Sequence, residues 1–112
     1  MIKAVVLVPV RDNDGRPFPK ALWEALQARF MQFGGFTRPI GVVGAWESGG
    51  RVYRDRSRQY TVALSSWRQV AAWLEVVDWA RGAFQQEAIY VEIAGVPEIL
   101  GASGQLLPGP GG

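Results

Sequence analysis

The sequence predicts an α+β fold of the ferredoxin-like type, with the element order β-α-β-β-α-β. Apolar, β-branched runs alternate with two segments in which apolar residues recur at helical spacing, and clusters of Gly, Pro, Asn and Asp separate them. The expected strands are 3–10, 37–47, 52–64 and 87–94, and the expected helices are about 19–33 and 66–84.

The first run, Lys3 to Val10, is apolar on both faces, which is typical of a central strand covered on two sides. Right-handed crossovers then give a four-stranded antiparallel sheet in the order 4-1-3-2, counted along the chain, with both helices on one face. The other face needs a second cover. We expect a second subunit there, and therefore a homodimer or larger homo-oligomer, with the C-terminal tail as the alternative cover.

Pro17 and Pro19 prepare the start of the first helix, since proline is tolerated in a first turn. Gly34 and Gly35 mark its end. The apolar positions between them that share one helical face are Leu22, Trp23, Leu26, Phe30 and Phe33.

The segment 37–47 contains Pro39 and two glycines, so an edge strand is expected. A Ser-Gly-Gly turn at 48–50 then reverses the chain into 52–64. That run begins charged and ends apolar, so we expect it to enter the sheet fully only near Gln59.

Ser66 and Gln69 have the spacing of a capping box at the start of the second helix. Its expected buried stripe is Val70, Trp73, Leu74, Val77, Ala80 and Phe84. The last strand, 87–94, alternates apolar and polar residues. We therefore expect a single domain over 1–100, followed by a Gly/Pro-rich tail over 101–112.

The composition sets the class of protein. The 112 residues are 48% apolar and 20% charged with a formal charge of +2, which predicts one small domain with its own core rather than a disordered chain. The chain contains no Cys and no His, so disulfides, thiolate zinc sites and His-based catalytic triads are excluded. We expect no metal, no cofactor and no membrane contact. The N-terminal apolar run is too short for a signal sequence, which favours a cytoplasmic protein.

Short motifs follow one another between residues 18 and 92: Gly35-Phe36-Thr37, Gly44-Ala45-Trp46, Asp55-Arg56-Ser57-Arg58 and Phe84-Gln85-Gln86-Glu87-Ala88. In this order they resemble the motifs of a group of small, uncharacterised bacterial proteins with the same element layout. The resemblance implies a ferredoxin-like fold and supplies no reaction. Members of that group often carry an export signal and a cysteine, which this chain lacks.

A candidate ligand site lies on the sheet face away from the helices. Alternation along 87–94 places Tyr90 and Glu92 on that face, where Gln59 and Thr61 of the third strand are expected beside them. Trp46, at the end of the second strand, is a further candidate, although large aromatic residues more often serve core or interface packing.

A second group is expected at one end of the sheet, where Arg11 follows the first strand, Arg38 precedes the second and Glu87 opens the last. A carboxylate near arginines can orient a ligand or act as a base. The structural alternative is an ion pair or a helix-to-strand cap.

Four arginines, Arg51, Arg54, Arg56 and Arg58, form a basic stretch that could bind phosphate groups. The alternative is a solvated hairpin. We expect no specific nucleic-acid binding, because the net basic excess is small and the first strand offers Val5 and Leu7 where an RNA-binding sheet presents aromatic residues.

Two function classes remain. The preferred one is a non-catalytic oligomerisation or interaction module that uses the open sheet face. The alternative is a small-molecule-binding protein or a cofactor-free enzyme of the dimeric α+β barrel type. Such an enzyme would need a carboxylate or a tyrosine as its acid or base, because histidine and cysteine are absent. The sequence leaves open whether the protein is an enzyme.

Overall fold

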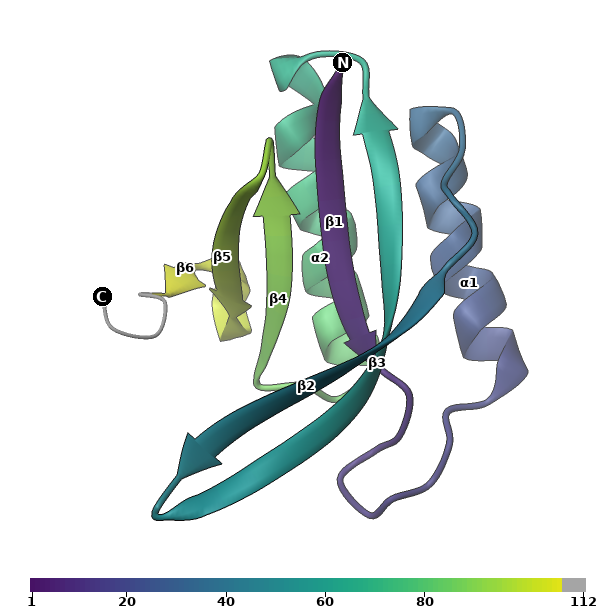
Figure 1. Cartoon of the computed structure of the whole chain (residues 1–112). Coiled ribbons are helices and arrows are strands. Elements are labelled where there is room, and N and C mark those ends of the chain that lie inside the picture. The colour runs from purple at the N-terminus through teal and green to yellow at the C-terminus, as the bar shows by residue number, and fades with distance from the viewer. Residues whose placement is uncertain (108–112) are drawn as a thin grey trace.

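The computed structural model describes residues 1–107, except the side chains of Trp46, Ser48, Ser103 and Leu107. One antiparallel sheet in the order β2-β3-β1-β4-β5-β6 carries two helices (Figure 1). The strands are β1 (Ile2–Pro9), β2 (Ile40–Ser48), β3 (Arg51–Leu64), β4 (Ala88–Ile93), β5 (Val96–Gly101) and β6 (Leu106–Leu107). The helices are α1 (Lys20–Phe30) and α2 (Val70–Ala83), with 3₁₀ turns η1 (Met31–Phe33), η2 (Trp67–Gln69) and η3 (Ala102–Gly104).

The predicted four-stranded sheet with the order 4-1-3-2 is wrong. β5 pairs with β4 from Ala88 to Ile93, and β6 pairs with the end of β5, so β4 lies inside a wider sheet. The physical reason is the turn Ala94-Gly95, whose φ angles of 54° and 80° reverse the chain directly after β4. Leu100 of β5 is fully buried, which gives the added strand its own place in the core.

β3 is longer than its neighbours. It pairs with β2 from Arg51 to Gln59, whereas β1 joins it only from Ser57 onward. The segment 43–56 therefore projects beyond the rest of the sheet as a two-stranded extension, which we call the arm (Figure 1). The sequence predicted that the run 52–64 enters the sheet fully only near Gln59. This describes its pairing with β1 and misses its earlier pairing with β2.

Both helices lie on one face of the sheet (Figure 1), and the core lies between them and the strands. Trp73 of α2, Phe30 of α1 and Tyr60 of β3 are fully buried in this layer. Ser66 accepts a hydrogen bond from the backbone N–H of Arg68 at 3.2 Å, and Gln69 accepts one from Ser65 at 2.7 Å. These two bonds satisfy backbone donors where the helical region begins.

The face away from the helices, which we call the open face, is partly covered within a single chain. Val5 is only 2% exposed and Leu7 is half-buried.

Residues 101–107 of the expected tail form the end of β5, η3 and β6, and residues 108–112 lie outside the described residues. Within residues 1–107, the helices are too short and too polar to cross a membrane.

Candidate ligand site on the open sheet face

Four of the predicted site residues form two rows across the open face. In the strand register, Leu7 is flanked by Gln59 on β3 and Tyr90 on β4. One step along the sheet, Val5 is flanked by Thr61 and Glu92 in the same way. Directly paired residues in an antiparallel sheet point to the same face, so the four polar side chains surround an apolar centre.

Tyr90 and Glu92 interact directly. The phenolic oxygen of Tyr90 donates a hydrogen bond to Glu92 Oε2 at 3.1 Å. Burial raises the pKa of Tyr90 above its ordinary value, and the hydrogen bond to Glu92 and the charge of that carboxylate raise it further. Tyr90 is therefore a protonated donor at neutral pH, and Glu92 keeps lone pairs for a second donor or for a cation.

A hollow of about 410 Å³ includes Tyr90 in its lining, whereas Glu92 lies outside that lining. The arm contributes Val43 and Asp55 to its walls, and the sheet contributes Leu7, Gln59 and Tyr90. Its volume lies within the range of roughly 300 to 1,000 Å³ that small-molecule sites occupy. The arm and the open face of one chain therefore line one hollow together.

The second predicted group does not come together as one site. Arg11 donates to the carbonyl of Gly15 at 3.0 Å, and Glu87 is exposed. Arg38 lies beside the C-terminal part of β3, because the preceding Thr37 donates its backbone N–H to Thr61 at 2.9 Å. Within residues 1–107, no hydrogen bond or ion pair joins Arg11, Arg38 and Glu87.

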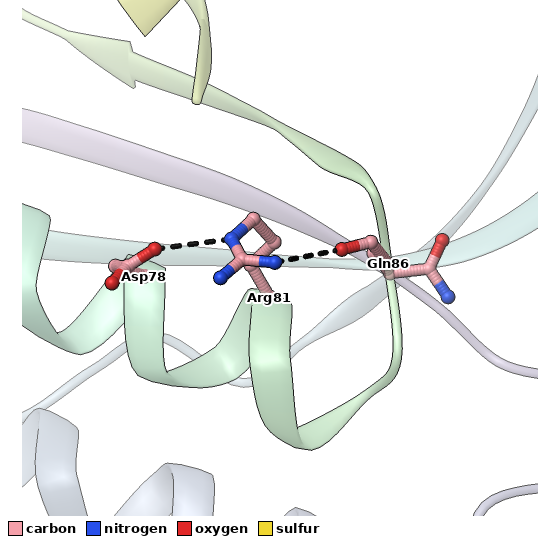
Figure 2. A network of polar contacts seen from close by, with 3 residues as sticks. All are labelled: Asp78, Arg81 and Gln86. Atoms are coloured by element: carbon pink, nitrogen blue, oxygen red, sulfur yellow. Dashed lines mark hydrogen bonds and ion pairs between the residues drawn. The ribbon is translucent and has the colours of Figure 1, made fainter. Parts of the chain in front are cut away.

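The loop before β4 is instead held by a structural contact (Figure 2). Arg81 at the end of α2 forms an ion pair with Asp78 at 3.0 Å, and its Nη1 donates to the carbonyl of Gln86 at 3.0 Å. One guanidinium therefore links the last turn of the helix to the segment that enters β4. None of Arg11, Arg38 and Glu87 takes part in this contact.

The basic stretch is divided between two faces. Strand alternation places Arg54, Arg56 and Arg58 on the face that carries the helices, and Arg51 on the opposite face. Three of these side chains are exposed: Arg51, Arg54 and Arg56. Arg58 is half-buried, and its guanidinium lies 4.0 Å from the centre of the Trp23 ring.

Sequence reasoning missed this stack of Arg58 on Trp23. The signal was present, because Arg58 and the buried Tyr60 are two residues apart and so share a face. Trp46 is paired with Tyr53 through its backbone, and its side chain lies outside the described part of the chain. Over residues 1–107, no group of three Asp or Glu side chains has the arrangement of a metal site.

No protein-family model matches the chain, and neither does any curated protein. Similar folds are found among solved structures. A phage SAM lyase in the apo state superposes with a TM-score of 0.68 and 17% identity, covering 91% of this chain and 90% of that one. The phage SAM lyase in complex with S-methyl-5'-thioadenosine gives 0.64 and 17%, covering 90% and 89%.

The divalent cation tolerance protein CutA1 from Thermus thermophilus gives a TM-score of 0.50 and 14% identity, covering 100% of this chain and 87% of that one. These neighbours are small α+β proteins with a fold of the ferredoxin-like type, and the likeness shows the fold alone. The motif resemblance to a group of small bacterial proteins stays a prediction.

Proposed function

We propose that the chain is a subunit of a homo-oligomer in which the open face and the arm form the interface, and that this interface encloses a site for a small organic molecule. Tyr90 and Glu92 are the residues that contact the ligand. The observation that carries the proposal is the hollow between the arm and the open face, which is lined by Tyr90, the hydrogen-bond partner of Glu92.

The exposed apolar surface of the arm is an argument for the oligomer. An isolated two-stranded hairpin is at best marginally stable in water, and both faces of the arm carry exposed apolar side chains. Val43 and Val52 are 65% and 63% exposed on one face, and Tyr53 is 40% exposed on the other. Tyr53 shares the open face with the hollow, whereas Val43 and Val52 lie on the face that carries the helices. A second copy that packs around both faces of the arm removes this apolar surface from water and closes the hollow.

The charge of the pair supports a ligand with a cationic or donor group. Glu92 accepts one hydrogen bond from Tyr90, which lines the hollow, and keeps lone pairs for a further donor or a cation. Two similar folds are described as a phage SAM lyase, one of them in complex with S-methyl-5'-thioadenosine. S-adenosylmethionine, whose sulfonium is cationic, and the neutral S-methyl-5'-thioadenosine are therefore the first ligands to test.

The experiment is a calorimetric titration of the purified chain with each of the two nucleosides. We expect the sulfonium compound to bind more tightly than the neutral thioether, because a carboxylate favours the cation. Glu92→Gln should reduce this preference, and Tyr90→Phe should weaken both ligands. Glu75→Gln, an exposed carboxylate on α2, is the matched control and should change neither affinity.

The titration also separates the two function classes. Chromatography of the incubated mixture shows whether S-methyl-5'-thioadenosine appears over time. Binding without conversion supports a ligand-binding module, and conversion that Glu92→Gln abolishes supports an enzyme. Absence of binding by either nucleoside at millimolar concentration would reject this ligand class and leave the oligomerisation module.

A further inference from the structure

A second hollow lies on the helix side of the sheet, away from the open face. It has a volume of about 580 Å³, is open to solvent, and is lined by the loop after β1, the start of α1 and β3. Arg11, Lys20 and Arg58 bring three positive charges to its walls, and Glu24 brings one negative charge. Phe18 and Trp23 supply the aromatic part of the lining.

Arg58 is the central group of this hollow. Its guanidinium lies 4.0 Å from the centre of the Trp23 ring, and its Nη1 donates to the phenolic oxygen of Tyr60 at 3.4 Å. The same oxygen accepts a hydrogen bond from Gln27 at 3.1 Å. The guanidinium is thus oriented by a ring, a phenol and, through that phenol, an amide, which fixes the direction of its other N–H donors.

The charge of Arg58 is not neutralised within the described residues 1–107. The ion pairs found there join Lys20 to Glu24 at 3.6 Å and Arg81 to Asp78. Glu24, the carboxylate of the hollow, is therefore already paired with Lys20, and Arg11 donates only to a backbone carbonyl. A half-buried guanidinium that has lost part of its hydration and has no carboxylate partner favours an anion from outside the chain.

We propose that this hollow binds a phosphate monoester with a flat, apolar body. The phosphate takes the donors of Arg58 and Arg11, because a phosphate that carries about −1.5 to −2 charge at pH 7 matches two cations. The flat body packs against the half-buried Phe18, whose ring meets the Trp23 ring edge to face at 6.3 Å and 81°. This site is separate from the Tyr90–Glu92 pair and does not depend on the proposed function.

The test uses phenyl phosphate as the probe, with inorganic phosphate and phenol as its two halves. Calorimetry on the full chain should show binding of phenyl phosphate that is tighter than that of either half. Arg58→Met keeps the apolar stem of the side chain and removes its charge, and it should weaken binding by about 10-fold or more, the effect expected for a charge-assisted hydrogen bond. Arg11→Met should weaken binding by a smaller factor.

Arg54→Met is the matched control, since Arg54 lies on the same face of β3 and outside this hollow. It should leave the affinity unchanged. Backbone amide shifts of the wild-type chain on titration should be largest over residues 10–24, a readout that does not require any variant to fold.

Three results would overturn the proposal. The first is equal affinity for inorganic phosphate and phenyl phosphate, which would remove the role of the aromatic wall. The second is an equal loss in Arg54→Met and Arg58→Met, which would show attraction to basic surface in general. The third is the absence of shifts near residues 10–24 at millimolar phenyl phosphate.

Discussion

Tyr90 donates a hydrogen bond to Glu92 across one residue of β4, at 3.1 Å. The two side chains share a face because the pleat of a strand has a period of two, and both stand next to β1, where Leu7 and Val5 are their direct partners. A donor and a carboxylate are thereby held together above an apolar centre. The fold raises the pKa of Tyr90, so the pair can be followed by titrating this tyrosine.

Glu92→Gln should lower the pKa of Tyr90 toward the ordinary value of about 10. Burial is the largest cause of the raised pKa and stays in the variant, so the return is partial, whereas the contributions of the carboxylate are lost. The phenolate absorbance of wild type, Glu92→Gln and Tyr90→Phe, titrated in parallel, gives the pKa of this one tyrosine. An unchanged titration curve in Glu92→Gln would mean that the hydrogen bond is absent in solution.

The same shift makes stability depend on pH. The folded chain favours the protonated phenol, so the contribution of Tyr90 is fully present below about pH 10 and is lost as the pH rises through the folded-state pKa. The urea midpoint should fall between neutral pH and a pH above 10, and this fall should be smaller in Tyr90→Phe than in wild type. A steeper fall in the variant would contradict the direction of the shift.

Trp73→Ala should lower the free energy of unfolding by about 3 to 5 kcal/mol, because Trp73 is fully buried between the sheet and α1. Trp73→Phe should cost less, since it keeps a ring in place and removes an indole N–H that has no hydrogen-bond partner within the described residues. Trp67→Ala is the control, because Trp67 is 66% exposed, and should change stability by less than about 0.5 kcal/mol. Equal urea midpoints for Trp73→Ala and Trp67→Ala would place the core elsewhere.

Ala94→Asn should stabilise the chain by about 0.5 to 1 kcal/mol. Ala94 has a φ of 54°, a left-handed conformation that asparagine adopts more readily than alanine, and Asn-Gly is the preferred sequence for a two-residue hairpin of this type. Gly95→Ala is the opposite control, since its φ of 80° disfavours any side chain, and should destabilise. A loss of stability in Ala94→Asn would show that the turn differs from the one described.

The arm should not bind nucleic acid specifically. Asp55 lies among the arginines of the arm, and the arginines are divided between its two faces, so no single face gathers all of the basic charge. We expect a Kd no tighter than the non-specific range of about 10⁻⁴ to 10⁻⁶ M at physiological salt. Fluorescence anisotropy with single- and double-stranded oligonucleotides measures this. Sub-micromolar binding that depends on base sequence and is lost in Arg54→Ala and Arg56→Ala would contradict it.

The open-face residues could be grouped from the sequence because a strand alternates with a period of two, and Tyr90, Glu92, Gln59 and Thr61 need only that rule and the pairing of β1 with β3 and β4. β5 was missed because Pro97 and the flanking glycines have the composition of a loop. Its place depends on one turn, in which Ala94 adopts a conformation that alanine propensity does not suggest.

Loop residues could not be placed in the same way. The position of Arg38 depends on how the segment before β2 runs along β3, which hydrogen bonds at Thr37 decide. The stack of Arg58 on Trp23 depends on the packing of α1 against the sheet. Such distances between elements follow from tertiary packing, which periodicity along the chain does not report.

The mass of the chain in solution shows whether the open face and the arm form an interface between copies of the chain. Sedimentation of wild type at micromolar concentration should give a multiple of the 12.3 kDa monomer, and Val43→Asp on the arm should shift it to the monomer and weaken nucleoside binding together. Met31→Asp, an exposed apolar position on η1, should change neither property. A wild-type monomer of 12.3 kDa, or a Val43→Asp variant that keeps both its assembly and its affinity, would contradict a ligand site enclosed between copies of this chain.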